Sequence, residues 1–412
     1  MVINMKSLKQ FLLSTIGSLL TASSAMAYPL DGYDETNINR LDGFFHSLLT
    51  DDGLKNLSAG SLLSITELKL QKPGLNYIPS EDRRLKAALM NIVPSGASVS
   101  VLNLSNPKSP QYAGINDNSS FVPGSVGKIM VAVSLFDALA RMHPRSIKDR
   151  EEILREKFIV ANDYIDTDEH DVPFWDEQNR KVYFRPIMHG ERANLWTYLD
   201  WMLSASSNAA TSMVMREVLS MNHFKENYPP SASEEARFFA SSAPQAIMQE
   251  SFARPMAAQG FGGGRLFQGS FFTKKAKSTI SGIGSSATTK DLLQLLLRME
   301  EGKLVDEFSS LELKRLLYLT QHRERYVGTS VLDDAAVYFK AGSLHKCSGS
   351  CEKYEGNVQN VLNGLTIVEY PVGDKKLYYM VALSTNVLRQ NAERLHQRIA
   401  TGIQNLLMAG RY

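Results

Sequence analysis

Ser125 and Lys128 stand three residues apart, where a Pro-Gly break gives way to a long apolar run. That run, residues 129–136, predicts a buried helix, so both side chains should share one face of its start. A hydroxyl beside an amine is the arrangement of an activated nucleophile. The N-terminus of a helix also adds partial positive charge where an acyl oxyanion would form. These two residues therefore indicate acyl transfer at a serine.

The spacing alone carries little weight, because Ser-x-x-Lys starts at four serines: Ser105, Ser125, Ser343 and Ser350. Only Ser125 is followed by a long apolar helix. A phosphate-binding loop is a rival interpretation of Gly124–Lys128. It fails because Val122 stands where such loops have glycine, and Ile129 where they have the serine or threonine that holds magnesium.

Two further polar patches follow along the chain. Small polar residues interrupt the apolar helical region 196–215 at Ser204 and at Ser206–Asn208. Buried hydroxyls and amides need hydrogen-bond partners, which favours a cleft wall over a surface turn. Farther on, Lys340-Ala341-Gly342 lies on a predicted strand, residues 335–344.

Taken in order, the three patches resemble the signature of the penicillin-recognising serine hydrolases: Ser-x-x-Lys, then Ser-x-Asn, then Lys-Thr/Ser-Gly. This family comprises the class A β-lactamases and the penicillin-binding D-Ala-D-Ala peptidases. Thr288-Thr289-Lys290-Asp291 also resembles the segment before the third motif. The resemblance runs from about Gly96 to the C-terminus. It implies an α/β (α+β), β-lactamase-like fold, with an antiparallel sheet flanked by helices and a separate helical subdomain.

The resemblance implies catalytic roles for four residues. Ser125 would attack a carbonyl and become acylated, and Lys128 would accept its proton. Ser206 would pass that proton to the departing nitrogen, with Lys340 orienting the hydroxyl. Substrate-binding roles fall to Asn208, Gly342 and Ser343. Asn208 would bind the substrate amide, and Gly342 would let the strand approach the substrate. The backbone N–H groups of Ser125 and Ser343 would form the oxyanion hole.

Two departures from the family pattern bear on function. Ala341 stands where the family has a threonine or serine that helps to hold the substrate carboxylate, and Ser343 is the candidate substitute. Class A β-lactamases also use a glutamate, shortly before the segment matching Thr288, to activate the deacylating water. Between Glu250 and Asp291 this chain has no carboxylate. Hydrolysis of a penicilloyl-serine is therefore expected to be slow.

The expected protein is an exported serine hydrolase of β-lactamase class A type, acylated by a β-lactam or a peptidoglycan-type peptide. The alternatives are a D-Ala-D-Ala carboxypeptidase, a slow-deacylating penicillin-binding protein, or a non-catalytic envelope protein that retains the fold for binding. No cofactor or metal is expected. The 412 residues carry a net charge of +2, which gives no indication of a nucleic-acid partner.

The N-terminus has the layout of a secretory signal peptide. Two lysines precede an apolar run over residues 11–20, and Ala25-Met26-Ala27 provides a cleavage site. We expect cleavage after Ala27 and a periplasmic or secreted protein with no transmembrane segment. The expected organisation is a signal peptide at 1–27, a helical N-terminal extension at 28–92 and the catalytic domain at 93–412.

Cys347 and Cys351 are the two cysteines of the sequence. In an oxidising compartment, a cysteine pair separated by Ser-Gly-Ser is best interpreted as a structural disulfide. Zinc is not favoured, because no further cysteine and no close pair of histidines accompanies them.

Elsewhere, period-2 and period-3.6 patterns predict the remaining elements. Helices are expected at 81–92 (capped by Ser80), 292–299 and 391–408, and strands at 97–104, 111–115, 364–370 and 375–384. The acidic stretch 145–190 is interpreted as a solvated loop in preference to a cation site, since it lacks the pattern of a calcium-binding loop. Residues 251–290, basic and glycine-rich, are interpreted as a mobile loop bordering a site.

Overall fold

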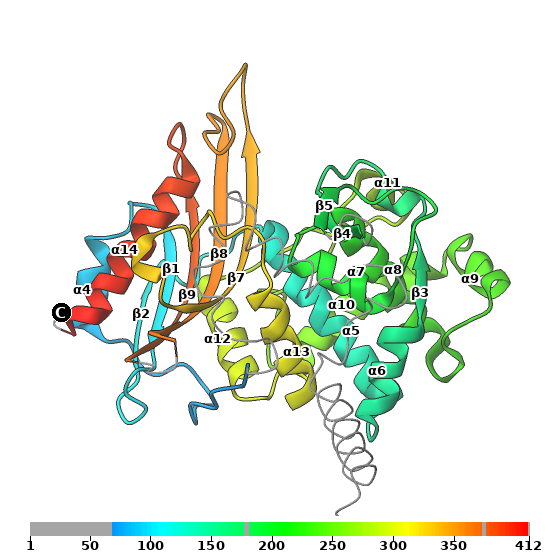
Figure 1. Cartoon of the computed structure of the whole chain (residues 1–412), viewed down its shortest axis with the longest axis horizontal. Coiled ribbons are helices and arrows are strands. Elements are labelled where there is room, and N and C mark those ends of the chain that lie inside the picture. Colours follow the sequence, from blue (N-terminus) through cyan, green and yellow to red (C-terminus); the bar gives the residue numbers. More distant parts are fainter. Residues whose placement is uncertain (1–67, 177–180, 373–375, 411–412) are drawn as a thin grey trace, which may run out of the picture.

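The computed structural model describes residues 68–176, 181–372 and 376–410, so the expected signal peptide and most of the expected extension lie outside the described residues. Two lobes lie side by side (Figure 1). One is built on a sheet with helices on both faces, and the other is mainly helical. Within the described residues, no helix combines the length and the apolar character needed to cross a membrane.

The five-stranded sheet has the order β2-β1-β9-β8-β7, and every neighbouring pair is antiparallel. Its strands are β1 (Ser98–Asn103), β2 (Gln111–Ile115), β7 (Ala336–Lys346), β8 (Gln359–Tyr370) and β9 (Leu377–Asn386). These strands confirm the alternating segments predicted from the sequence. The order leaves β7 as the edge strand that faces the helical lobe (Figure 1).

Helices cover both faces of the sheet, which explains why β1 and β9 are buried along nearly their whole length. On one face lie α4 (Arg83–Met90), η7 (Ser330–Leu332) and α14 (Ala392–Ala409), and on the other α12 (Thr289–Glu300) and α13 (Glu307–Tyr318). The predicted cap of the first helix is wrong. Asp82, not Ser80, accepts hydrogen bonds from the N–H groups of Arg84 and Leu85.

The helical lobe is organised around α5 (Lys128–Met142), the predicted apolar helix, which follows the short turn η4 (Gly124–Gly127). It packs against α7 (Leu195–Leu203), α8 (Asn208–Phe224) and α10 (Ala243–Ala258). The remaining elements are η6 (Lys225–Asn227), α9 (Ala232–Phe239) and α11 (Lys274–Thr279). Helices α10 and α11 correct the interpretation of 251–290 as one loop.

The stretch 145–190 is also more ordered than expected. It folds into α6 (Ile147–Glu156), β3 (Phe158–Val160), η5 (Asp163–Ile165), β4 (Val172–Asp176) and β5 (Lys181–Arg185). Strand β3 pairs with β6 (Arg192–Asn194), and β4 pairs with β5. Its acidic cluster is not uniformly solvated, because the side chain of Asp168 is only 3% exposed.

Residues 68–78 form an extended strap across the sheet lobe. Its backbone donates hydrogen bonds to α12, including one from Gln71 to the Glu300 carboxylate and one from Ile78 to the Gln294 amide. Beneath it, Lys314 is fully buried between Glu300 and Glu369, at 2.7 and 2.8 Å. The Lys314 ammonium also donates to the backbone carbonyl of residue 69 (2.8 Å). The strap is thus an integral part of the fold.

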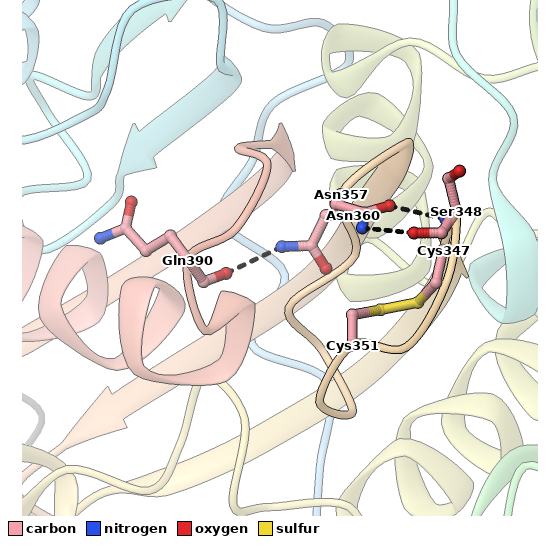
Figure 2. Close-up of a disulfide and its surroundings, with 6 residues drawn as sticks. All are labelled: Cys347, Ser348, Cys351, Asn357, Asn360 and Gln390. Atoms are coloured by element: carbon pink, nitrogen blue, oxygen red, sulfur yellow. Dashed lines mark hydrogen bonds between the residues drawn. A yellow bond between two sulfur atoms is a disulfide. The ribbon is translucent and has the colours of Figure 1, made fainter.

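The predicted disulfide is confirmed. Cys347 and Cys351 are joined in the connection between β7 and β8, beyond the end of the sheet (Figure 2). In the same connection Asn357 exchanges hydrogen bonds with the backbone of Ser348. Asn360, at the start of β8, ties this region to the loop before α14 through the carbonyl of Gln390 (2.8 Å).

Candidate active site

Ser125 lies half-buried in turn η4, immediately before α5. Its backbone is pressed against β7: a Cβ placed on Gly342 would stand 2.6 Å from the Ser125 nitrogen. Only glycine permits this approach. From the neighbouring strand, Asn363 donates to the carbonyls of Val122 and Pro123, both at 3.0 Å. The edge of the sheet therefore holds the Ser125 turn at a fixed place.

Lys128 begins α5 and has no exposed surface. Its ammonium nitrogen is 2.5 Å from the carbonyl oxygen of Ser206, 2.8 Å from Oδ1 of Asn208 and 3.3 Å from the Ser206 hydroxyl. The carbonyl and amide oxygens only accept. A neutral amine can satisfy both with its two hydrogens and still keep one lone pair for a proton.

Ser206 lies in the break between α7 and α8, where the sequence predicted an interrupted helix. Its φ of 62° is unusual for a residue with a side chain and marks a conformation that its surroundings must hold. Ser207 then caps α8 by accepting from the N–H of Ala210 (3.0 Å). The polar residues of this break are buried and hydrogen-bonded, as expected of a cleft wall.

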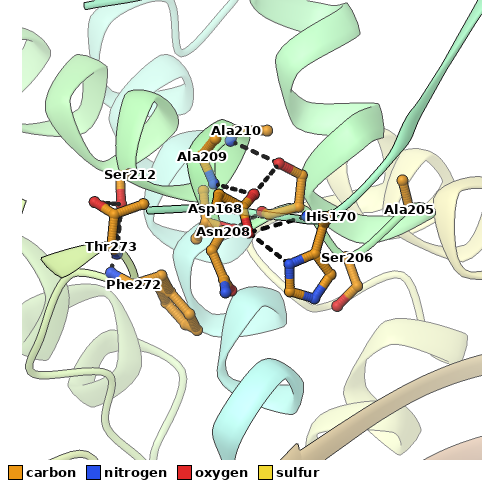
Figure 3. A network of polar contacts seen from close by, with 12 residues as sticks. Asp168, His170, Ala205, Ser206, Asn208, Ala209, Ala210, Ser212, Phe272 and Thr273 are labelled. Atoms are coloured by element: carbon orange, nitrogen blue, oxygen red, sulfur yellow. Dashed lines mark hydrogen bonds and ion pairs between the residues drawn. The ribbon is translucent and has the colours of Figure 1, made fainter. Parts of the chain in front are cut away.

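Asp168 ties the break to the stretch before α7 (Figure 3). One of its oxygens accepts from the Ser207 hydroxyl (2.9 Å) and from the backbone N–H of Ala209 (2.7 Å). The other lies 2.5 Å from Nδ1 of His170. The carboxylate is thereby held at the N-terminus of α8, where negative charge is stabilised.

Lys340 reaches the same serine from the sheet. Its ammonium nitrogen is 2.7 Å from the Ser206 hydroxyl and 3.1 Å from the carbonyl of Ala341, and the side chain is 1% exposed. The Ser206 hydroxyl thus lies between two lysines that come from opposite lobes. An oxygen that accepts from Lys340 still has its own hydrogen to donate.

Burial disfavours the charged form of both amines. It lowers the pKa of Lys128 to about 7, with Asp168 acting against this effect and Arg325 adding to it. Burial also brings the pKa of Lys340 well below its usual value, and the charges of Lys128 and Arg325 act in the same direction. Burial alone would raise the pKa of Asp168, but its bonds to His170 and Ala209 and the charge of Lys128 hold it below the usual value.

The segment before α11 contacts the Ser125 turn and the start of α5 through Gln268 and Phe272. Gln268 is 4% exposed, and its amide oxygen would lie 2.1 Å from a Cβ placed on Gly127. That oxygen is buried without a hydrogen-bond partner in the described structure. The ring of Phe272 lies 5.0 Å from the Lys128 ammonium. An amide and an aromatic ring, not a carboxylate, therefore approach the turn from this side.

The structure thus joins Lys128, Ser206, Asn208 and Lys340 by direct hydrogen bonds and packs the backbone of Ser125 against Gly342. Ser343 follows on β7 as a half-buried residue outside this group in the described structure. The sequence interpretation missed three residues: Asp168, Gln268 and Asn363. Gly127, directly before Lys128, was an available signal for Gln268, because a missing side chain marks a close approach.

Among the described residues, no group of three histidine, cysteine, aspartate or glutamate side chains could hold a metal ion. The acidic run instead forms pairs with neighbouring histidines. Asp166 lies 2.5 Å from Nε2 of His189, and Asp168 contacts His170 as above.

Solved structures that are similar to this chain include β-lactamases. The extended-spectrum β-lactamase TLA-3 is 13% identical, with 79% of this chain and 98% of that chain covered and a TM-score of 0.53. A β-lactamase from Chitinophaga pinensis is 14% identical, with 79% and 98% covered and a TM-score of 0.51. The extended-spectrum β-lactamase TLA-1 is also 14% identical, with 80% and 99% covered and a TM-score of 0.50. At these identities the similarity defines the β-lactamase-like fold.

A comparison of the sequence with family models identifies the family. A sequence model of the beta-lactamase enzyme family matches residues 83–407, so the chain belongs to that family. No curated protein matches the chain.

Proposed function

We propose that this protein is a serine hydrolase whose Ser125 is acylated by a β-lactam or by a peptidoglycan-type peptide. The observation that carries the proposal is the group of two buried lysines and one serine at the edge of β7. In this group the pKa of Lys128 is lowered to about 7. Lys128 lies three residues after the proposed nucleophile Ser125, and an amine that is partly neutral at pH 7 is the base that such a nucleophile needs.

The proposed reaction gives each of these residues a defined role. Lys128 accepts the proton of Ser125 as its oxygen attacks the carbonyl, and the N–H groups of Ser125 and Ser343 bind the oxyanion. The Ser206 hydroxyl, held by Lys340 at 2.7 Å, then donates a proton to the departing nitrogen. It recovers one from Lys128, 3.3 Å away. Asn208 binds the substrate amide. The products are an acyl-serine and, for a peptide, the released amine.

We further propose that the acyl-enzyme is long-lived. Two observations favour this: residues 251–290 contain no carboxylate, and Gln268 is the polar side chain that this segment brings to the Ser125 turn. An amide can hold a water molecule but cannot take its proton. A slow-deacylating penicillin-binding protein or a D-Ala-D-Ala carboxypeptidase is therefore the second candidate beside an efficient β-lactamase.

One experiment tests both statements. Purified protein is mixed with a fluorescent penicillin, and the intact mass is followed after the free drug is removed. We expect one adduct on the wild type, none on Ser125→Ala, and an unchanged adduct on Ser105→Ala, the serine of another Ser-x-x-Lys. Absence of an adduct, without turnover of the drug, would favour a non-catalytic envelope protein. Complete return to the native mass within seconds would refute the long-lived ester.

We also propose that the protein is exported with cleavage after Ala27. The disulfide between Cys347 and Cys351 supports an oxidising compartment. N-terminal sequencing of the protein from the periplasmic fraction should begin at Tyr28. A first residue within 1–20 would contradict the proposal.

A further inference from the structure

Asp168 has no counterpart among the residues that the sequence motifs suggested, yet it contacts the same segment as Lys128. One of its oxygens accepts from Ser207 and Ala209, the residues on either side of Asn208, and Asn208 accepts from Lys128 at 2.8 Å. The Asp168 carboxylate and the Lys128 amine therefore both bind the short stretch 206–209. Figure 3 shows the contacts of Asp168 in this stretch.

The charge around this stretch is otherwise mostly positive. Lys128 and Lys340 share the Ser206 hydroxyl, and the charge of Arg325 acts on both. On Lys128, Asp168 is the negative group that opposes these cations. Among the described residues, the titratable and charged groups around Lys128 and the 205–209 segment include Asp168, His170, His322, Arg325 and Lys340. Glu324 pairs with His322 and Arg325 behind them.

Backbone conformation also indicates that Asp168 is held in place. Thr167, immediately before it, has a φ of 66°, and Ser206 across the contact has a φ of 62°. Each such position costs on the order of 1 kcal/mol and persists only where surrounding contacts impose it. The bonds from Asp168 to Ser207 and Ala209 are contacts of that kind.

We propose that Asp168 is a positioning residue that acts through Ser207 and Lys128: it fixes the 206–208 segment and sets the pH range in which Ser125 is acylated. The proposal rests on the proposed function, because it assumes that Lys128 accepts the proton of Ser125.

The direction of the effect follows from the charges. A negative carboxylate favours the protonated form of a nearby amine, so Asp168 raises the pKa of Lys128 and Arg325 lowers it. Removing the charge of Asp168 should lower the pKa of Lys128 below about 7. The neutral amine would then be available at lower pH, and the acidic limb of the acylation profile would move downward.

The test is the second-order rate constant for acylation by a fluorescent penicillin, measured from pH 5 to 9. Asp168→Asn removes the charge and keeps an oxygen that can accept from Ser207 and Ala209. Asp168→Ser is a second charge-free variant in case the first does not fold. We expect the acidic limb to move down by about one pH unit, the low end of what a neighbouring carboxylate does. Asp166→Asn, an exposed carboxylate paired with His189, is the matched control and should leave the limb in place.

Ser207→Ala alters the position of the segment but not its charge, because it removes one bond to Asp168 and the side-chain cap of α8 and keeps the carboxylate. It should lower the maximal rate constant without moving the limb. The charge-free variants could instead lower the acylation rate constant and leave the acidic limb of its pH profile where it is in the wild type. In that case Asp168 has only a structural role and the proposal is wrong. If Ser125 of the wild type is never acylated, the proposed function is wrong, and the inference about Asp168 is then wrong as well. The two failures are therefore distinguishable.

Discussion

In the proposed reaction, the charge of Lys128 decides whether the hydroxyl of Ser125 can lose its proton. Burial lowers the pKa of this amine to about 7, so its neutral fraction falls about tenfold for each pH unit below that value. Lys128→Arg should reduce the acylation rate constant by 10²–10⁴-fold, since a guanidinium stays charged and cannot accept the proton. In the wild type the rate constant should rise with pH and level off above about 7.

The measurement is the rate of adduct formation with a fluorescent penicillin, for both proteins, from pH 5 to 9. Lys108→Arg is the matched control, because it alters the lysine of another Ser-x-x-Lys and should leave the rate unchanged. A wild-type rate that stays constant down to pH 5 would show that Lys128 is not the base.

The residues that could be predicted from the sequence were those in short motifs. Ser206 and Lys340 were found because a Ser-x-Asn break and a Lys-x-Gly strand follow Ser125 in the right order. Asp168 was missed because a carboxylate in an acidic run resembles a solvated one until its partners on α8 are known. Gln268 was missed because its position depends on a contact with Gly127, 141 residues away in the chain, and no local pattern encodes that contact.

At the scale of elements, the connection between β7 and β8 extends beyond the sheet and is closed by one disulfide (Figure 2). Replacing Cys347 and Cys351 by serine should lower the stability of this connection by at most about 2 kcal/mol, because so short a loop restricts the unfolded chain little. Hydrogen exchange should increase over residues 346–358, while acylation of Ser125 stays unchanged. A loss of acylation would show that the connection helps to shape the active site.

Helices and strands were predicted correctly where a long segment carries a regular apolar pattern, and were missed where the segment is short. The apolar run of α5 and the alternating strands β7, β8 and β9 were predicted because burial on both sides leaves a clear pattern. Strands β3 and β6 span three residues each, which is too short for a recognisable alternation. Strands β4 and β5 contain aromatic residues but were overlooked because the stretch around them is polar and acidic. In α10, Pro255 lies inside the helix and weakens the helical signal.

At the scale of the whole molecule, a buried ion cluster joins α12, α13 and β8. Lys314 lies between Glu300 and Glu369, and all three side chains are nearly or fully buried. Lys314→Met should destabilise the protein by about 3–5 kcal/mol, because two carboxylates would remain in the interior without a cation. The effect is measured as the free energy of unfolding in urea.

Lys303→Met is the control, since Lys303 is half-exposed and lies 3.7 Å from Glu301. Surface pairs of this kind contribute about 0–1 kcal/mol. A similar decrease in the free energy of unfolding for both variants would contradict the prediction that the buried cluster stabilises the fold. The cluster could not be predicted from the sequence, because its three members are 69 residues apart at the extremes and none has a distinctive local pattern.

The strap at residues 68–78 has a practical consequence for anyone who shortens this protein. The family match begins at residue 83, so a gene trimmed to the matching residues would omit the strap and remove the backbone carbonyl of residue 69 that binds Lys314. Such a truncated protein should be recovered in poor yield and aggregate on warming, even though every residue assigned to chemistry is still encoded. Expression vectors should therefore begin upstream of Leu68.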